Sequence, residues 1–239
     1  MNKLIIFLLL PMVFFFSCGK NGIFKDSAKD CIYDFVIPDN DSVSAKSYLI
    51  GDISGQDLHI YDGDGEFFFM VAGITGFTSY PGEWVDPSSD TLKDAKSALA
   101  FIFMQEEPEN FPVYFSITTP FYKFGTSLVD MVDSIANKKN LTVGDDNDKI
   151  KGYTFSFSIP CEKYNLSPIQ FATVINWLDS YYFDQNGKWI KVVNFSKKST
   201  ATGRWEYDIT FDVNVNLFTR RGYYVDLKGI FKTHFSLKK

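Results

Sequence analysis

The strongest structural signal in the chain is the stretch WEYDITFDVNVNL, residues Trp205–Leu217. Apolar and polar residues alternate along its whole length, and a period of two is typical of a strand with one buried and one solvated face. A turn sequence, Thr219–Gly222, follows it, and Tyr223–Phe235 then alternates in the same way. Together the two stretches predict a long antiparallel hairpin.

The length of this hairpin constrains the architecture around it. At about 3.3 Å per residue, a strand over residues 205–217 spans about 43 Å, which is longer than most strands. We therefore expect the pair to curl or to carry a bulge, as in a strongly twisted sandwich or a barrel.

Weaker patterns predict further strands and a few helices. We expect strands at Cys31–Ile37, Ser47–Ile53, Gln56–Tyr61, Phe67–Ala72, Ala98–Met104, Val113–Thr118, Tyr153–Ile159 and Trp189–Phe195. Helical spacing behind a Ser127/Asp130 capping box predicts a helix over Ser127–Ala136. A shorter helix is expected from Ser89 or Asp90 to about Ser97. Ser167-Pro168 fits a third helix start, but Ile169–Phe183 is also rich in β-formers, so its state stays open.

Many short strands, antiparallel turn sequences and few helices predict a single all-β domain. We favour an antiparallel two-sheet sandwich with one or two short helices. The alternative is a calycin-like or lipocalin-like closed barrel.

The amino-terminal segment has the pattern of an export signal. Lys3 precedes an apolar run, Leu4–Phe16, which is shorter than the roughly 20 residues that a spanning helix needs. Ser17-Cys18-Gly19 follows directly and resembles the lipobox of bacterial lipoproteins. The resemblance implies that residues 1–17 are removed as a signal peptide and that acylated Cys18 anchors the protein in a lipid bilayer. Residues 18–30 are then a lipidated tether, and residues 31–239 the β-rich domain.

Ser17 before the cysteine and the Phe-rich leader resemble outer-membrane lipoproteins of the Bacteroidota. The closing hairpin with Gly229-Ile230-Phe231 is similar to uncharacterised β-rich lipoproteins of the same group. The resemblance implies an outer-membrane, lipid-anchored protein. Residues 19–22 lack the acids associated with surface export, so either face of that membrane fits. The O-glycosylation motif of this group, Asp-Ser/Thr-aliphatic, marks Ser27 and Ser42 as candidate sites.

After lipidation of Cys18, two cysteines remain. Cys31 and Cys161 form an even pair in an exported protein, which permits a disulfide. The alternative is two buried free thiols in strands.

The acidic and basic residues give little support for a catalytic, metal or nucleic-acid site. The net charge is −5, with acids and bases spread along the chain, so we expect no nucleic-acid partner. His59 and His234 are the two histidines, and neither stands in a catalytic motif. We predict no catalytic residue, no cofactor and no metal. Asp62, Asp64 and Glu66 are spaced like oxygen ligands for Ca²⁺, but a polar turn before the Phe67 strand explains them without a metal, and we favour that interpretation.

The best candidate binding surface is a Gly/Pro-punctuated loop with Phe77, Tyr80 and Trp84. Exposed loops carry function more often than scaffolds do, and aromatic rings stack on the apolar faces of sugars. We therefore expect a non-enzymatic module that binds a glycan or another protein. The alternatives are a lipocalin-like binder of an apolar small molecule and a carbohydrate-active hydrolase.

Overall fold

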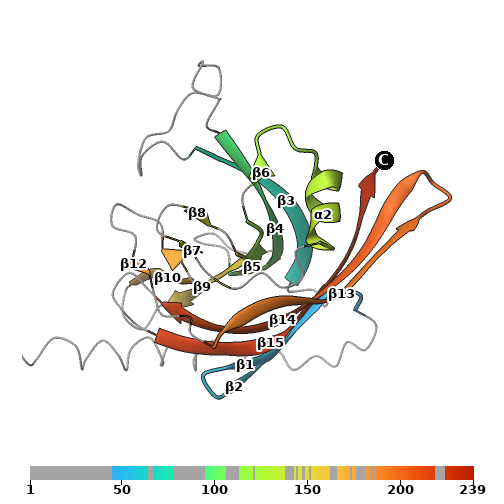
Figure 1. Cartoon of the computed structure of the whole chain (residues 1–239). Helices are drawn as coiled ribbons and strands as arrows, with labels where there is room; N and C mark the ends of the chain where they lie inside the picture. The colour runs from blue at the N-terminus through green and yellow to red at the C-terminus, as the bar shows by residue number, and fades with distance from the viewer. Residues whose placement is uncertain are drawn as a thin grey trace, which may run out of the picture.

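The computed structural model describes residues 45–63, 67–77, 95–105, 113–120, 122–137, 143, 145–146, 149–150, 152–161, 166–172, 174–175, 181–182, 185, 187–218 and 224–239. Its described part is mostly β-structure with one short helix (Figure 1). No helix within these ranges is long and apolar enough to span a membrane.

The strands form two antiparallel sheets of five strands each. The first sheet has the order β2 (Gln56–Tyr61), β1 (Tyr48–Ile53), β15 (Tyr224–Lys238), β14 (Arg204–Phe218) and β13 (Trp189–Ser199). The second has the order β10 (Leu166–Ala172), β9 (Thr154–Cys161), β5 (Tyr114–Thr118), β4 (Ala95–Gln105) and β3 (Phe67–Phe77). Short strand β6 (Tyr122–Lys123) pairs with the beginning of β4. Two small ladders complete the described strands: β7 (Asp145–Asp146) with β8 (Lys149–Ile150), and β11 (Val174–Ile175) with β12 (Tyr181–Tyr182).

The two sheets meet at one corner, where Ala172 of β10 pairs with Phe218 of β14. Strands β2 and β3 lie at the two ends of this path and do not pair with each other. The described strands therefore form an open sandwich and not a closed barrel, which confirms the all-β two-sheet prediction.

The predicted hairpin forms the centre of the first sheet. Strands β14 and β15 pair without a register shift from Arg204↔Lys238 to Phe218↔Tyr224. The long pair curls, and one end projects beyond the second sheet (Figure 1). A bulge occurs on the neighbouring strand instead, between Val192 and Asn194 of β13.

Phenylalanine rings fill the space between the sheets. Phe101 and Phe103 of the second sheet lie 5.4 Å from Phe211 and 5.0 Å from Phe231 of the first sheet, measured between ring centroids. All four side chains are completely buried. Burial of this much aromatic surface is the main favourable term that holds the layers together.

Local signals explain the predicted turn and helix. Ser54 and Gly55 connect β1 to β2 with φ angles of 53° and 88°, the conformation that a tight two-residue hairpin turn requires. Helix α2 (Leu128–Ile135) begins after Ser127, whose hydroxyl accepts a hydrogen bond from the Asp130 amide. It buries Met131, Val132 and Ile135.

In three segments the structure corrects or completes the sequence-based prediction. Residues 95–97, the end of the helix predicted from Ser89, lie in β4 because they pair with residues 75–77 of β3; residues 89–94 lie outside the described ranges. The segment from Ser167-Pro168, left open above, is strand β10, which pairs with β9. Phe77 is the last residue of β3 and not part of the loop.

Candidate functional site

Most residues singled out from the sequence lie outside the described ranges. These are Cys18, Ser27, Cys31, Ser42, Asp64, Glu66, Tyr80 and Trp84. Cys161 ends strand β9. Asp62 uses its carboxylate to accept a hydrogen bond from the Phe69 amide at 2.9 Å. Asp62 therefore has a role in the turn between β2 and β3, as the polar-turn interpretation expects.

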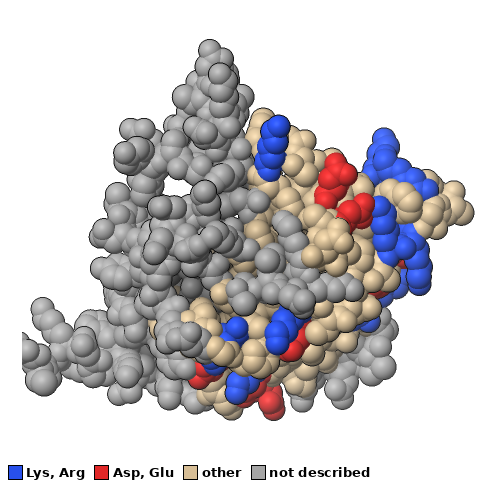
Figure 2. All heavy atoms as spheres, in the orientation of Figure 1, with Lys and Arg blue, Asp and Glu red and all other residues tan. Residues whose placement is uncertain are grey.

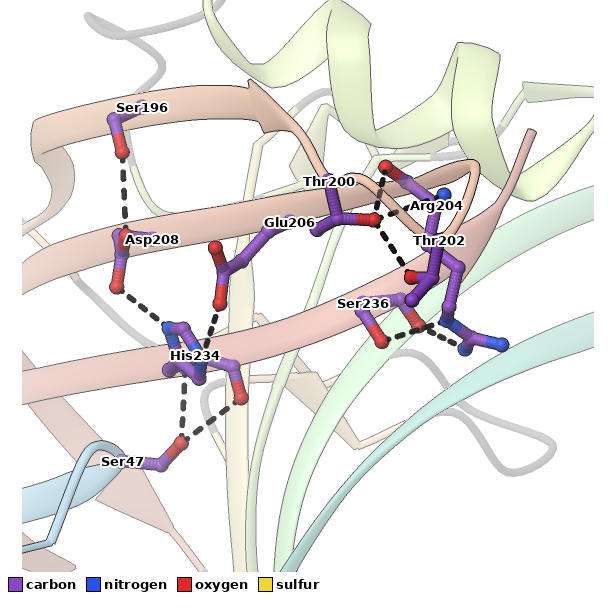
Figure 3. A network of polar contacts seen from close by, with 9 residues as sticks. All are labelled: Ser47, Ser196, Thr200, Thr202, Arg204, Glu206, Asp208, His234 and Ser236. Atoms are coloured by element: carbon purple, nitrogen blue, oxygen red, sulfur yellow. Dashed lines mark hydrogen bonds and ion pairs between the residues drawn. The ribbon is translucent and has the colours of Figure 1, made fainter.

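His234 lies at the centre of a polar network on the outer face of the first sheet (Figure 3). Its Nδ1 is 2.9 Å from Asp208 Oδ1, and its Nε2 is 3.2 Å from Glu206 Oε1. The backbone N–H of His234 donates to Ser47 Oγ at 2.9 Å, and the Ser47 hydroxyl donates to the carbonyl of His234 at 3.3 Å. The ring and the backbone of His234 therefore each have partners from other strands or segments.

The electrostatics of this network involve the carboxyl group of Asp208. Burial by itself raises the pKa of Asp208, but hydrogen bonds and charge from His234, with a further hydrogen bond from Ser196, outweigh burial. The net effect lowers the pKa below its ordinary value of 3.8. The charged form of Asp208 is therefore the one that the fold stabilises.

The geometry of the network suits a structural clamp better than a reactive centre. The carboxylates of Glu206 and Asp208 contact opposite nitrogens of one ring, so they do not converge on one ion. The hydroxyl group of Ser47 is hydrogen-bonded to the backbone of His234. Among the described residues, no three His, Cys, Asp or Glu side chains are arranged to hold a metal ion.

A second cluster lies where β13, β14 and β15 project beyond the second sheet, on the inner face of the first sheet. We define the Trp205 platform as Trp205, Lys197, Ser199 and Lys239. The ammonium groups of Lys197 and Lys239 lie 4.1 Å and 4.6 Å from the centroid of the half-buried Trp205 ring. The Lys239 ammonium also donates to Ser199 Oγ. One indole therefore contacts two cations, one from strand β13 and one from the residue that follows β15.

Lys197 is the fixed cation of the platform. Its Nζ lies 2.6 Å from Asp133 Oδ2 of helix α2, and the Tyr207 hydroxyl donates to the other oxygen of that carboxylate at 3.1 Å. Burial by itself lowers the pKa of Lys197, but the hydrogen bonds and charge of Asp133 and Tyr207 raise it above its ordinary value. Lys197 thus stays protonated and ties α2 to the first sheet.

The projecting end is also basic and rich in hydroxyl groups. Lys198, Arg204, Lys238 and Lys239 are exposed, and Figure 2 shows lysine and arginine side chains gathered at this end. The Arg204 guanidinium donates to the hydroxyl and the carbonyl of Ser236 (Figure 3). The guanidinium is thereby held on the outer face of the sheet, opposite the platform.

A second tryptophan–lysine pair lies elsewhere on the same sheet. Lys191 lies 4.4 Å from the centroid of the Trp189 ring. However, the Trp189 indole N–H donates to the Asp212 carboxylate at 2.8 Å. A carboxylate is therefore part of this second site, which makes it a natural control for the Trp205 platform.

The alternation of apolar and polar residues includes Trp205, but it predicts a buried position for this side chain. Alternation places Trp205 on the same face as Tyr207 and Ile209, which are completely buried. Trp205 packs against the core but stays partly exposed, since it lies near the beginning of β14, at the end of the strand that projects beyond the second sheet (Figure 1). Comparison with known proteins supplies no relative, since no family model, no curated protein and no solved structure matches the chain.

Proposed function

We propose that this protein is a lipid-anchored, non-enzymatic module of the bacterial outer membrane that binds a glycan on its β-sandwich. The observation that carries the proposal is the Trp205 platform. A partly exposed indole, surrounded by the hydroxyl of Ser199 and by charged donors, has the chemistry of a sugar site: an apolar surface for the ring and donors for its hydroxyls.

The packing of the sandwich favours a surface site over an interior one. The rings of Phe101, Phe103, Phe211 and Phe231 occupy the space between the sheets and are completely buried. A lipocalin-like binder keeps a cavity at this position for its ligand. The packed interior of the described sandwich therefore supports binding on the outside.

The arrangement of the outer-face carboxylates favours binding over glycoside hydrolysis. A glycosidase places two carboxyl groups on either side of its scissile bond. Glu206 and Asp208 instead lie on one strand face with the His234 ring between them. Both carboxylates contact His234, and this structural role accounts for their presence on the outer face.

Binding is tested with the purified mature protein on a glycan array. We expect Trp205→Ala to reduce binding of the captured glycan about tenfold, the loss of about one aromatic stacking contact. Trp189→Ala is the matched control and should bind as the wild type does. Tyr80→Ala and Trp84→Ala test whether the predicted loop adds a second contact. Capture of no glycan, or full binding by Trp205→Ala, would contradict the proposal.

The anchor is tested separately by mass spectrometry of the mature amino terminus. We expect the chain to begin at Cys18 and to carry acyl chains, since each buried methylene adds about 0.8 kcal/mol of membrane affinity. An unmodified Cys18 in protein from the native membrane would overturn the anchor, whatever the array shows.

A further inference from the structure

We infer that the Trp205 platform selects glycans that carry an anionic group, either a carboxylate or a sulfate ester. Lys239 is the residue that pairs with this anionic group. This inference rests on the proposed glycan binding and names the class of glycan. It follows from the different surroundings of the two lysines on one indole.

Lys197 has its charge satisfied within the protein. Its ammonium contacts Asp133 at 2.6 Å, and only a quarter of its side chain is exposed. It also lies over the rings of both Trp205 and Tyr207. A ligand that displaced Lys197 would have to break the tie between helix α2 and the sheet, so Lys197 stays in place.

The ammonium group of Lys239 contacts neutral side chains in the described part of the chain. It is exposed, and its ammonium contacts the Trp205 ring and the hydroxyl of Ser199. A cation–π contact at an exposed site is weak. A sugar can therefore take the place of Lys239 on the ring, and the displaced ammonium can pair with an acidic substituent of the same sugar.

The surrounding charge favours an anion. Exposed Lys198, Arg204 and Lys238 lie at the same end of strands β13, β14 and β15, on the outer face of the sheet, and add to the positive charge of this end. The nearby acids are engaged, since Asp133 pairs with Lys197 and Glu206 contacts His234. The whole chain carries a net charge of −5, so this basic end is a local feature that would attract an acidic polymer.

The Trp189 site, in contrast, has a negatively charged group bound to its indole. Its lysine lies on the ring in the same way, but the indole N–H is bound to the Asp212 carboxylate. An anionic sugar would meet that negative charge. The two sites thus differ in ligand charge preference although both pair tryptophan with lysine.

The experiment measures dissociation constants of the mature protein for matched oligosaccharides. One pair is an oligogalacturonide and its fully methyl-esterified form, and the other is a sulfated galactan oligosaccharide and its desulfated form. We expect the charged member of at least one pair to bind about tenfold more tightly than its neutral partner, with the difference shrinking between 50 and 200 mM NaCl. The pair that shows the difference identifies carboxylate or sulfate.

Variants then assign the selectivity to the platform. Lys239→Gln should abolish most of the difference in affinity between charged and neutral ligand. Trp205→Ala should weaken both. Lys191→Gln, which removes the same charge from the Trp189 site, should change neither.

The outcomes separate the two proposals. Equal binding of charged and neutral oligosaccharides overturns the charge selectivity while glycan binding stands. A charge preference that persists in Lys239→Gln overturns the role of Lys239. Binding of no oligosaccharide, together with an empty glycan array, overturns the proposed function itself.

Discussion

At the scale of single residues, His234 shows how a solvated strand face acquires specific order. The side chain lies between two carboxylates of the neighbouring strand, and its backbone holds Ser47 at the beginning of the described chain. Ser47 is completely buried, although serine is mostly an exposed residue. The network therefore fastens the segment before β1 onto β15 and explains a buried serine without a catalytic role.

Replacement of Asp208 by asparagine tests this network through the pH dependence of stability. The folded state lowers the pKa of Asp208 below 3.8, so the carboxylate contributes stability that is complete above that pH and lost as the pH falls below it. We expect Asp208→Asn to lower the free energy of unfolding by about 0.5 to 1 kcal/mol at pH 7, and by progressively less in strong acid.

Urea unfolding of the two proteins between pH 2 and 7 measures this difference. Asp57→Asn on the exposed face of β2 serves as the control and should follow the wild type. A difference that does not change with pH would contradict the assigned role of the carboxylate.

At the scale of secondary-structure elements, the pairing of β1 with β15 depends on two glycines that face each other, Gly51 and Gly229. A Cβ on Gly51 would lie 2.1 Å from the Lys228 carbonyl oxygen, and a Cβ on Gly229 would lie 2.5 Å from the Ile50 carbonyl oxygen. Both obstacles are backbone atoms, which cannot rotate away. The Gly-x-Phe sequence of the closing hairpin thus marks a close approach of two strands.

Gly229→Ala is therefore expected to lower the free energy of unfolding by about 1 to 3 kcal/mol, since the strands must separate to admit the methyl group. Chemical denaturation measures the change. Gly73→Ala is the matched control, because its Cβ would meet the flexible end of Leu128 at 3.1 Å. If both variants lose equal stability, the close approach is not what Gly229 provides.

Local sequence is sufficient to predict some secondary-structure elements but not others. Helix α2 was predicted from Ser127 and Asp130 because a capping box and an apolar stripe are local features. Residues 95–97 were predicted as helix and form strand, because their pairing with β3 is a contact between distant segments. Local propensity gives way to a full ladder of backbone hydrogen bonds.

At the scale of the whole molecule, Phe231 connects the two layers. Its ring lies 5.0 Å from Phe103 and 6.3 Å from Phe155 across the sandwich, and 6.3 Å from Phe211 on its own sheet. The side chain is completely buried. The stability of each sheet therefore depends on the other.

Phe231→Ala is expected to lower the free energy of unfolding by about 3 to 5 kcal/mol, because it leaves a cavity between the sheets. Far-UV circular dichroism and tryptophan fluorescence should report one shared transition in urea. Ile230→Ala, the neighbouring residue on the outer face with 36% exposure, should cost much less. Two separate transitions in the wild type would contradict the mutual dependence of the sheets.

The sequence by itself determined most of the described long strands, the Ser54-Gly55 turn, the capped helix and the all-β class, because alternation, turn residues and caps act over a few neighbouring residues. It left sandwich and barrel open, and the tertiary structure decided between them: β2 and β3 do not pair, and the sheets meet at a single corner. The Trp205 platform is likewise a product of the tertiary structure. The alternation assigned Trp205 to the buried face, but burial requires a second layer above it, and the hairpin extends beyond that layer.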